Sequence, residues 1–237
     1  MFALLKKEIR SYFITPIGYV FVAVYLAVNG VLFTNLTLKA TVPTTSVDAY
    51  FTTSILALVL LVPLLTMRSF SEERKMKTDQ LLLTSPISLA AMVGAKLLGA
   101  YIVYALTMVA SAVNMFALGI YGNTVNYAAI FGSYLSLLLI GLACVSIGVF
   151  VSALTENQLI SAVLTMAFLL VIVYLSLFNS QIESDFLRAV LSWISLLDRY
   201  ALFTYGIFDL SALIYYISIA GVFYFLTVRV FEKRRWG

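Results

Sequence analysis

The sequence predicts an all-α membrane protein that crosses the bilayer six times. Of its 237 residues, 62% are hydrophobic and 11% are charged, whereas soluble domains carry about 25% charged residues. The apolar residues form six runs that are long enough, as helices, to cross about 30 Å of hydrocarbon. We therefore expect a single transmembrane domain over residues 1–237, with spans at about 16–38, 51–67, 92–120, 127–153, 159–178 and 210–228.

A basic amphipathic pattern precedes the first span. Apolar side chains recur at helical spacing between Phe2 and Phe13, and three cations occupy the other side. Such a helix lies at the interface between lipid and water, and the alternative is a charged flank without a defined surface position. Pro16 suits the first turn of the span that follows. The residues assigned to this interfacial helix are Lys6, Lys7, Glu8, Arg10, Tyr12 and Phe13.

The longest polar interruption separates the second and third spans, at residues 68–88. Ser69 stands three residues before Glu72, which is the spacing of a capping box. Glu73 precedes Lys77 by four residues, and this spacing favours an ion pair along one helical face. A leucine run follows as the apolar end of this helix, and Pro86 then breaks it. The segment therefore predicts a short helix at the membrane surface, charged at its start.

The later spans carry two further patterns. The fourth span is rich in small residues, which allow helices to approach closely. We expect them to pack inside the bundle, although the same residues could line a substrate path. Between the last two spans, residues 179–209 are amphipathic and too interrupted by charge to cross the bilayer. We expect interfacial or re-entrant helices there.

Basic residues are divided unequally between the two sides of the membrane. Six spans place both termini on the same side as residues 68–88, and positive residues concentrate in cytoplasmic loops. We therefore expect both termini in the cytoplasm and residues 179–209 on the outer side. The terminal side carries twelve of the 15 lysines and arginines, namely Lys6, Lys7, Arg10, Arg68, Arg74, Lys75, Lys77, Lys96, Arg229, Lys233, Arg234 and Arg235.

Several kinds of chemistry have no residues to support them. The chain has no histidine, one cysteine, no phosphate-binding GxxxxGK[ST] loop and neither a GxSxG nor an HExxH motif. The centres of the predicted spans contain no charged residue, so a carrier driven by protons or sodium would have no coupling site. We expect no catalytic residue, no metal site and no nucleic-acid partner, and any energy for transport has to come from another protein.

Four stretches resemble the ABC-2 family, the membrane subunits of type-2 ATP-binding-cassette exporters. Within it they are similar to the six-span permeases of gliding motility and of nitrous-oxide-reductase maturation. They are Leu4–Phe21, similar to an elbow helix, Ser69–Ser88, similar to a coupling helix, Arg199–Ile219, similar to an outer re-entrant segment, and Thr227–Trp236, similar to a basic tail. Lys77 stands where members commonly have glycine, which predicts a more continuous helix.

The resemblance implies a bacterial inner-membrane complex of two permease chains, identical or different, and two cytoplasmic ATPase subunits. ATP and Mg²⁺ would bind to the ATPases, and their movement would push on the coupling and elbow helices to drive export. The alternative is mechanical or assembly work on an extracytoplasmic partner, without cargo. The resemblance assigns ATPase coupling to Glu72, Glu73, Arg74, Lys77, Asp79, Gln80, Leu81, Leu82, Thr84, Ser85 and Pro86, and the outer segment to Arg199, Tyr200 and Asp209.

Overall fold

The computed structural model describes residues 2–38, 48–78, 88–115, 127–178, 195–197, 199–204 and 206–236, and within these ranges it contains helices and no strand. In the described part of the chain, six helices are long and apolar enough to cross a membrane: α2, α3, α6, α8, α9 and α12. This confirms the predicted six-span all-α fold. The elements are α1 (Phe2–Ile14), α2 (Pro16–Phe33), the π-helical turn η1 (Thr34–Leu38), α3 (Asp48–Thr66), α4 (Ser71–Lys75), α6 (Leu89–Ser111), α8 (Tyr127–Leu154), α9 (Gln158–Phe178), α11 (Ala201–Thr204) and α12 (Leu210–Trp236).

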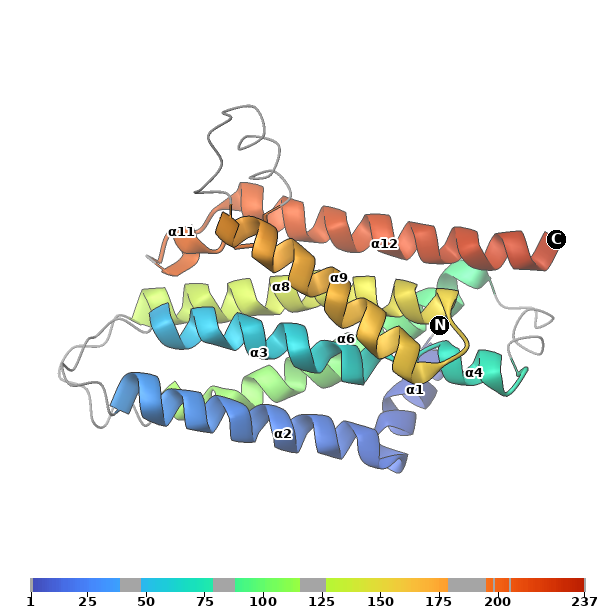
Figure 1. Cartoon of the computed structure of the whole chain (residues 1–237), viewed down its shortest axis with the longest axis horizontal. Helices are drawn as coiled ribbons and strands as arrows, with labels where there is room; N and C mark the ends of the chain where they lie inside the picture. The colour runs from blue at the N-terminus through green and yellow to red at the C-terminus, as the bar shows by residue number, and fades with distance from the viewer. Residues whose placement is uncertain are drawn as a thin grey trace.

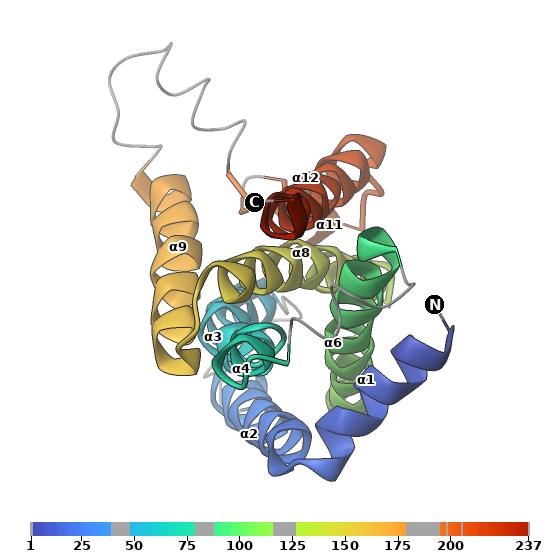
Figure 2. The ribbon, with the colours of Figure 1, turned by 90° about the vertical axis from the view of Figure 1, so that its right-hand side faces the viewer.

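The spanning helices pack around α8. This helix contacts α3, α6, α9 and α12, and Figure 2 shows it between α9 and α12. Both termini lie at one end of the bundle together with α1 and α4, whereas α11 lies at the opposite end (Figure 1). Termini at one end are what an even number of spans requires. That this end faces the cytoplasm stays a prediction.

The helix bounds differ from the predicted spans by a few residues. α6 begins at Leu89, three residues earlier than predicted, because the Ser88 side chain caps it by accepting a hydrogen bond from the Ala91 amide at 3.3 Å. α12 continues past the predicted span end and carries the basic tail as helix. The predicted end of the third span, residues 116–120, lies outside the described residues.

The small residues of α8 are packing positions. Gly132, Gly141, Ser146, Gly148 and Ser152 are all buried. A side chain at Gly141 would overlap the ring of Tyr104 in α6, and one at Gly148 would overlap Thr66 at the end of α3. This confirms close packing of α8, rather than a substrate path along these residues.

Candidate functional site

The short helix α4 is capped by another part of the bundle. It begins at Ser71, and no side chain of its own segment caps it. Instead, the backbone amides of Phe70 and Ser71 donate to the Ser152 hydroxyl of α8, at 3.0 and 3.1 Å. The Ser69 hydroxyl lies 3.4 Å from the hydroxyl of Tyr12 in α1. The predicted capping box is therefore wrong, because α8 supplies the acceptor and Ser69 contacts α1.

Replacing Ser152 by alanine is expected to lower the free energy of unfolding by about 1–3 kcal/mol, because two buried amides lose their acceptor. Ser146→Ala is the matched control, since Ser146 is equally buried in α8 but donates to Ala143 O of its own turn at 2.7 Å. Thermal unfolding of both variants in lipid nanodiscs measures the difference. Equal losses would contradict the capping role.

Glu72 and Arg74 of α4 form ion pairs with residues outside the helix. Glu72 accepts from Arg68, with 2.6 Å between Oε1 and Nη2. Arg74 reaches the carboxyl end of α8, where its Nη1 donates to Leu154 O at 2.7 Å and its Nη2 lies 3.1 Å from Glu156. A cation is favourable at this position because the last carbonyls of a helix lack partners and carry partial negative charge. Arg74 therefore ties α4 to the turn between α8 and α9.

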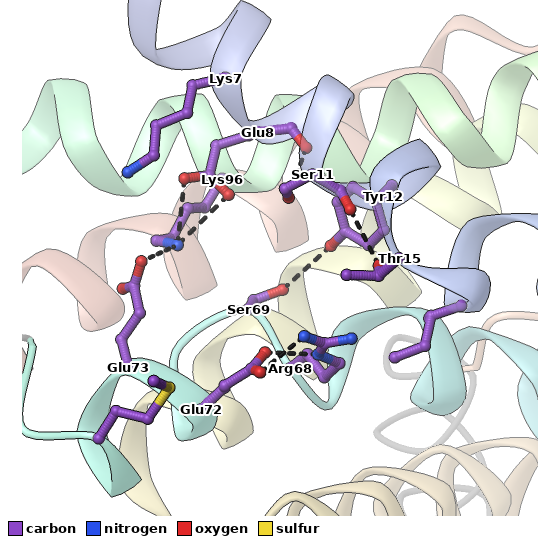
Figure 3. Close-up of a pocket in the computed structure, with 12 residues that line it drawn as sticks. Lys7, Glu8, Ser11, Tyr12, Thr15, Arg68, Ser69, Glu72, Glu73 and Lys96 are labelled. Atoms are coloured by element: carbon purple, nitrogen blue, oxygen red, sulfur yellow. Dashed lines mark hydrogen bonds and ion pairs between the residues drawn. The ribbon is translucent and has the colours of Figure 1, made fainter.

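Lys96 lies at the centre of the site and joins three helices (Figure 3). It lies near the start of α6, and its side chain is only 6% exposed. Its Nζ lies 2.8 Å from Glu73 Oε1 in α4, and 3.2 and 3.3 Å from the two carboxylate oxygens of Glu8 in α1. Glu73 thus bonds across the site to α6, and the predicted pair between Glu73 and Lys77 is wrong.

This cluster of Glu8, Glu73 and Lys96 carries two carboxylates for one ammonium group. Glu73 Oε2 is buried and has no hydrogen-bond partner among the described residues. A cavity of about 200 Å³ opens beside the cluster, lined by α1, the turn after α3, α4 and α6. Removing one member of a buried ion pair leaves an uncompensated charge in a poorly solvated place. Separating α6 from both α1 and α4 would leave Lys96 without a carboxylate partner and therefore carries an energetic penalty.

Tyr12 provides another contact between α1 and the rest of the bundle, at the end of α3. Its hydroxyl lies 3.4 Å from Leu65 O and from Ser69 Oγ. Burial raises the pKa of Tyr12 to about 12, so the group stays protonated and can donate at neutral pH. Residues 2–14 are helical as predicted, and their role as an elbow stays a prediction. Glu8 and Tyr12 face the bundle, Phe13 is half-buried, and Lys6, Lys7 and Arg10 are exposed.

α4 ends at Lys75 in a Schellman motif. The Thr78 amide donates to Glu73 O at 2.9 Å, and the Lys77 amide donates to Arg74 O at 3.1 Å. This pair of bonds requires a left-handed residue at the C′ position, and Lys77 adopts it with φ +55°. The prediction that lysine in place of glycine makes the helix more continuous is therefore wrong, since the backbone bonds close the helix in spite of the side chain.

Lys77→Gly is expected to raise the free energy of unfolding by up to about 1 kcal/mol. A left-handed conformation costs about 1–2 kcal/mol for a residue with a Cβ, and glycine removes this cost. Part of the gain is cancelled because glycine increases the entropy of the unfolded chain. Lys75→Gly, within the helix, is the matched control and is expected to lower it by about 1 kcal/mol. Thermal unfolding in nanodiscs compares the two. A loss at both positions would contradict the left-handed assignment.

The structure brings only part of the predicted coupling set together. Glu72, Glu73 and Arg74 are bonded to side chains or backbone groups of the bundle, and Lys75, Met76 and Lys77 are exposed. The sequence did not single out Lys96 or Ser152 as members of the site, although a lysine in an apolar span is itself a signal of function. Outside the described residues lie Asp79, Gln80, Leu81, Leu82, Thr84, Ser85 and Pro86.

The predicted outer residues lie at the opposite end of the bundle, where α12 begins. Asp209 Oδ1 accepts from the Ser211 amide at 2.9 Å. Arg199 donates from Nη1 to Ser211 Oγ at 3.0 Å, and its guanidinium lies 4.3 Å from the ring centroid of Tyr215. Tyr200 is buried. These residues shape the start of α12 and do not contact the Lys96 cluster.

Comparison with known proteins identifies the family. The family model described as "ABC-2 family transporter protein" matches residues 15–229. The chain belongs to the ABC-2 family. It is therefore a multi-pass membrane protein and a permease component of an ABC transporter. A comparison of the ABC-2 permease with curated proteins finds no match, and the narrower resemblance to gliding-motility and nitrous-oxide-reductase-maturation permeases stays a prediction.

Proposed function

We propose that this ABC-2 permease pairs with a second permease chain on two cytoplasmic ATPase subunits and couples their ATP hydrolysis to export across the bacterial inner membrane. The sequence contains no phosphate-binding loop, so the ATPases would bind ATP and Mg²⁺. The end that carries α1, α4 and both termini faces the cytoplasm in this proposal, because it holds most of the basic residues.

The observation that carries the proposal is the ion cluster around Lys96. It links α4 to α6 through Glu73 and to α1 through Glu8, at 2.8 to 3.3 Å. Ser152 and Arg74 add bonds from α4 to α8. A push on α4 would therefore reach three helices through bonds that are costly to break. This is the mechanical property that a coupling element needs.

The exposed residues at the end of α4 and directly after it form the surface that we assign to ATPase docking. Lys75, Met76 and Lys77 are exposed, and Met76 leaves 66% of its surface accessible. The two acidic residues of α4 already have ion-pair partners within the bundle, so the exposed side chains carry the assignment. An exposed thioether between two cations suits a hydrophobic groove with acidic residues at its rim, since methionine adapts to irregular surfaces.

The test is co-expression with the ATPase encoded beside the gene, followed by purification in nanodiscs. Met76→Glu is expected to reduce ATPase retention at least about tenfold, the effect of losing a central apolar contact. Lys233→Glu is the matched control, because Lys233 is exposed on α12 at the same end of the bundle. If Lys233→Glu loses the ATPase and Met76→Glu retains it, the docking site is on the basic tail and not at the end of α4.

Single-particle imaging of the retained complex tests the stoichiometry of two permeases and two ATPases. For transport, the complex is placed in vesicles of the same lipid composition as the nanodiscs. ATP-dependent movement of a compound across the vesicle membrane would support export. Hydrolysis that moves no compound but requires an extracytoplasmic protein would favour the mechanical role.

A further inference from the structure

An apolar groove runs between α9 and α12, along the side of α8. The part of the groove farther from the termini has a volume of about 430 Å³ and is lined by α8, α9 and α12, with Val171, Leu175 and Ile219 among its residues. A second depression of about 270 Å³ continues it toward the terminal end. Phe168 and Phe223 line both parts, and their ring centroids are 6.1 Å apart. The groove therefore extends along three helices that are long and apolar enough to cross a membrane.

One cation stands at the end of this groove that is distant from the termini. The Arg199 guanidinium lies 4.3 Å from the ring centroid of Tyr215, and Tyr215 lines the groove. Its Nη1 donates to Ser211, but its Nε is buried and donates no hydrogen bond within the described part of the chain. Among those residues, no carboxylate forms an ion pair with Arg199. Within the described ranges, the positive charge of the guanidinium thus stays uncompensated and can attract an anion.

We propose that the groove binds one anionic phospholipid, with an acyl chain between α9 and α12 and the phosphate on Arg199. A tyrosine and an arginine at the end of an apolar stretch are typical of the headgroup layer, and guanidinium groups bind phosphate through parallel hydrogen bonds. A net negative headgroup complements a cation that has no carboxylate partner among the described residues, whereas the ammonium group of a zwitterionic lipid opposes it. This inference does not depend on ATPase coupling, because neither Arg199 nor the lining of the 430 Å³ part belongs to α4.

Native mass spectrometry of the full-length permease tests the headgroup contact, with phosphatidylglycerol and phosphatidylethanolamine as the two probes. The wild-type chain is expected to retain one phosphatidylglycerol in preference to phosphatidylethanolamine. Arg199→Gln is expected to weaken this preference about fivefold, the effect of one cation near an anionic headgroup. Arg229→Gln is the matched control, since Arg229 also stacks on a ring of α12, Phe225 at 4.8 Å, but outside the groove. Equal binding of the two lipids, or equal effects of the two variants, would overturn the proposal.

A second pair of variants tests the apolar part, and it stays informative if Arg199→Gln fails to fold. Ile219→Trp is expected to fill the groove and displace the lipid, whereas Val222→Trp is expected to leave it bound, because Val222 is exposed on α12 and does not line the groove. A photoreactive benzoylphenylalanine at Val171 is expected to yield a lipid adduct. A crosslinked permease dimer as the main product would show that a second copy covers the groove and would overturn the proposal.

Discussion

Replacing Lys96 by methionine is expected to lower the free energy of unfolding by about 3–5 kcal/mol, the penalty for removing one partner of a buried ion pair. The side chains of Glu8 and Glu73 are only 13% and 22% exposed, and both depend on the same ammonium group. Methionine keeps the approximate length of the side chain, so the change isolates the charge. Thermal unfolding in nanodiscs measures stability, and ATP hydrolysis by the assembled complex measures coupling.

A neutral version of the cluster separates stability from coupling. Combining Lys96→Met with Glu8→Gln and Glu73→Gln removes all three charges of the cluster. Replacing a whole buried ion cluster by neutral residues often recovers the stability that is lost when only one partner is removed. If the ion pairs transmit the push on α4, the triple variant is stable and still poorly coupled. Lys233→Met, at an exposed position of α12, is the control and is expected to be stable. Wild-type stability of Lys96→Met would show that the two carboxylates do not depend on this cation.

The membrane spans could be predicted from sequence because hydropathy is a local property. The predicted bounds 127–153 and 159–178 lie within one residue of α8 and α9. The same holds for the start of α2 at Pro16, since proline both follows the amphipathic helix and suits the first turn of the next. The placement of both termini at one end then follows from the number of spans.

The contacts of α4 could not be predicted in the same way because they join distant parts of the chain. Ser152 lies 82 residues from Phe70, whose amide it caps, and Lys96 lies 88 residues from Glu8. A capping box or an i,i+4 ion pair describes only neighbours, and here tertiary partners replace both. The prediction of a more continuous helix at Lys77 fails for another reason. Helix propensity does not decide the conformation of this residue, because backbone hydrogen bonds impose a left-handed conformation there.

Gly141→Val is expected to lower the free energy of unfolding by about 3 kcal/mol, the upper end of the usual effect of overpacking. The new side chain would overlap the ring of Tyr104 in α6. That ring is fully buried, and its hydroxyl donates to Leu137 O at 2.7 Å, so it cannot turn away without losing a hydrogen bond. Thermal unfolding in nanodiscs measures the loss. The contact is important for the whole bundle because α8 is its central helix.

Gly221→Val is the matched control, because apart from its chain neighbours and the backbone of its own helix, no atom lies within 4 Å of a Cβ built at Gly221 in α12. It is expected to change the stability little. Adding Tyr104→Ala to Gly141→Val should recover part of the loss, since the two side chains then share the space of one, and such coupling between contacting residues is what a double-mutant cycle detects. If Gly141→Val were as harmless as Gly221→Val, the small residues of α8 would face open space. The case for a substrate path along this helix would then be stronger than the case for packing.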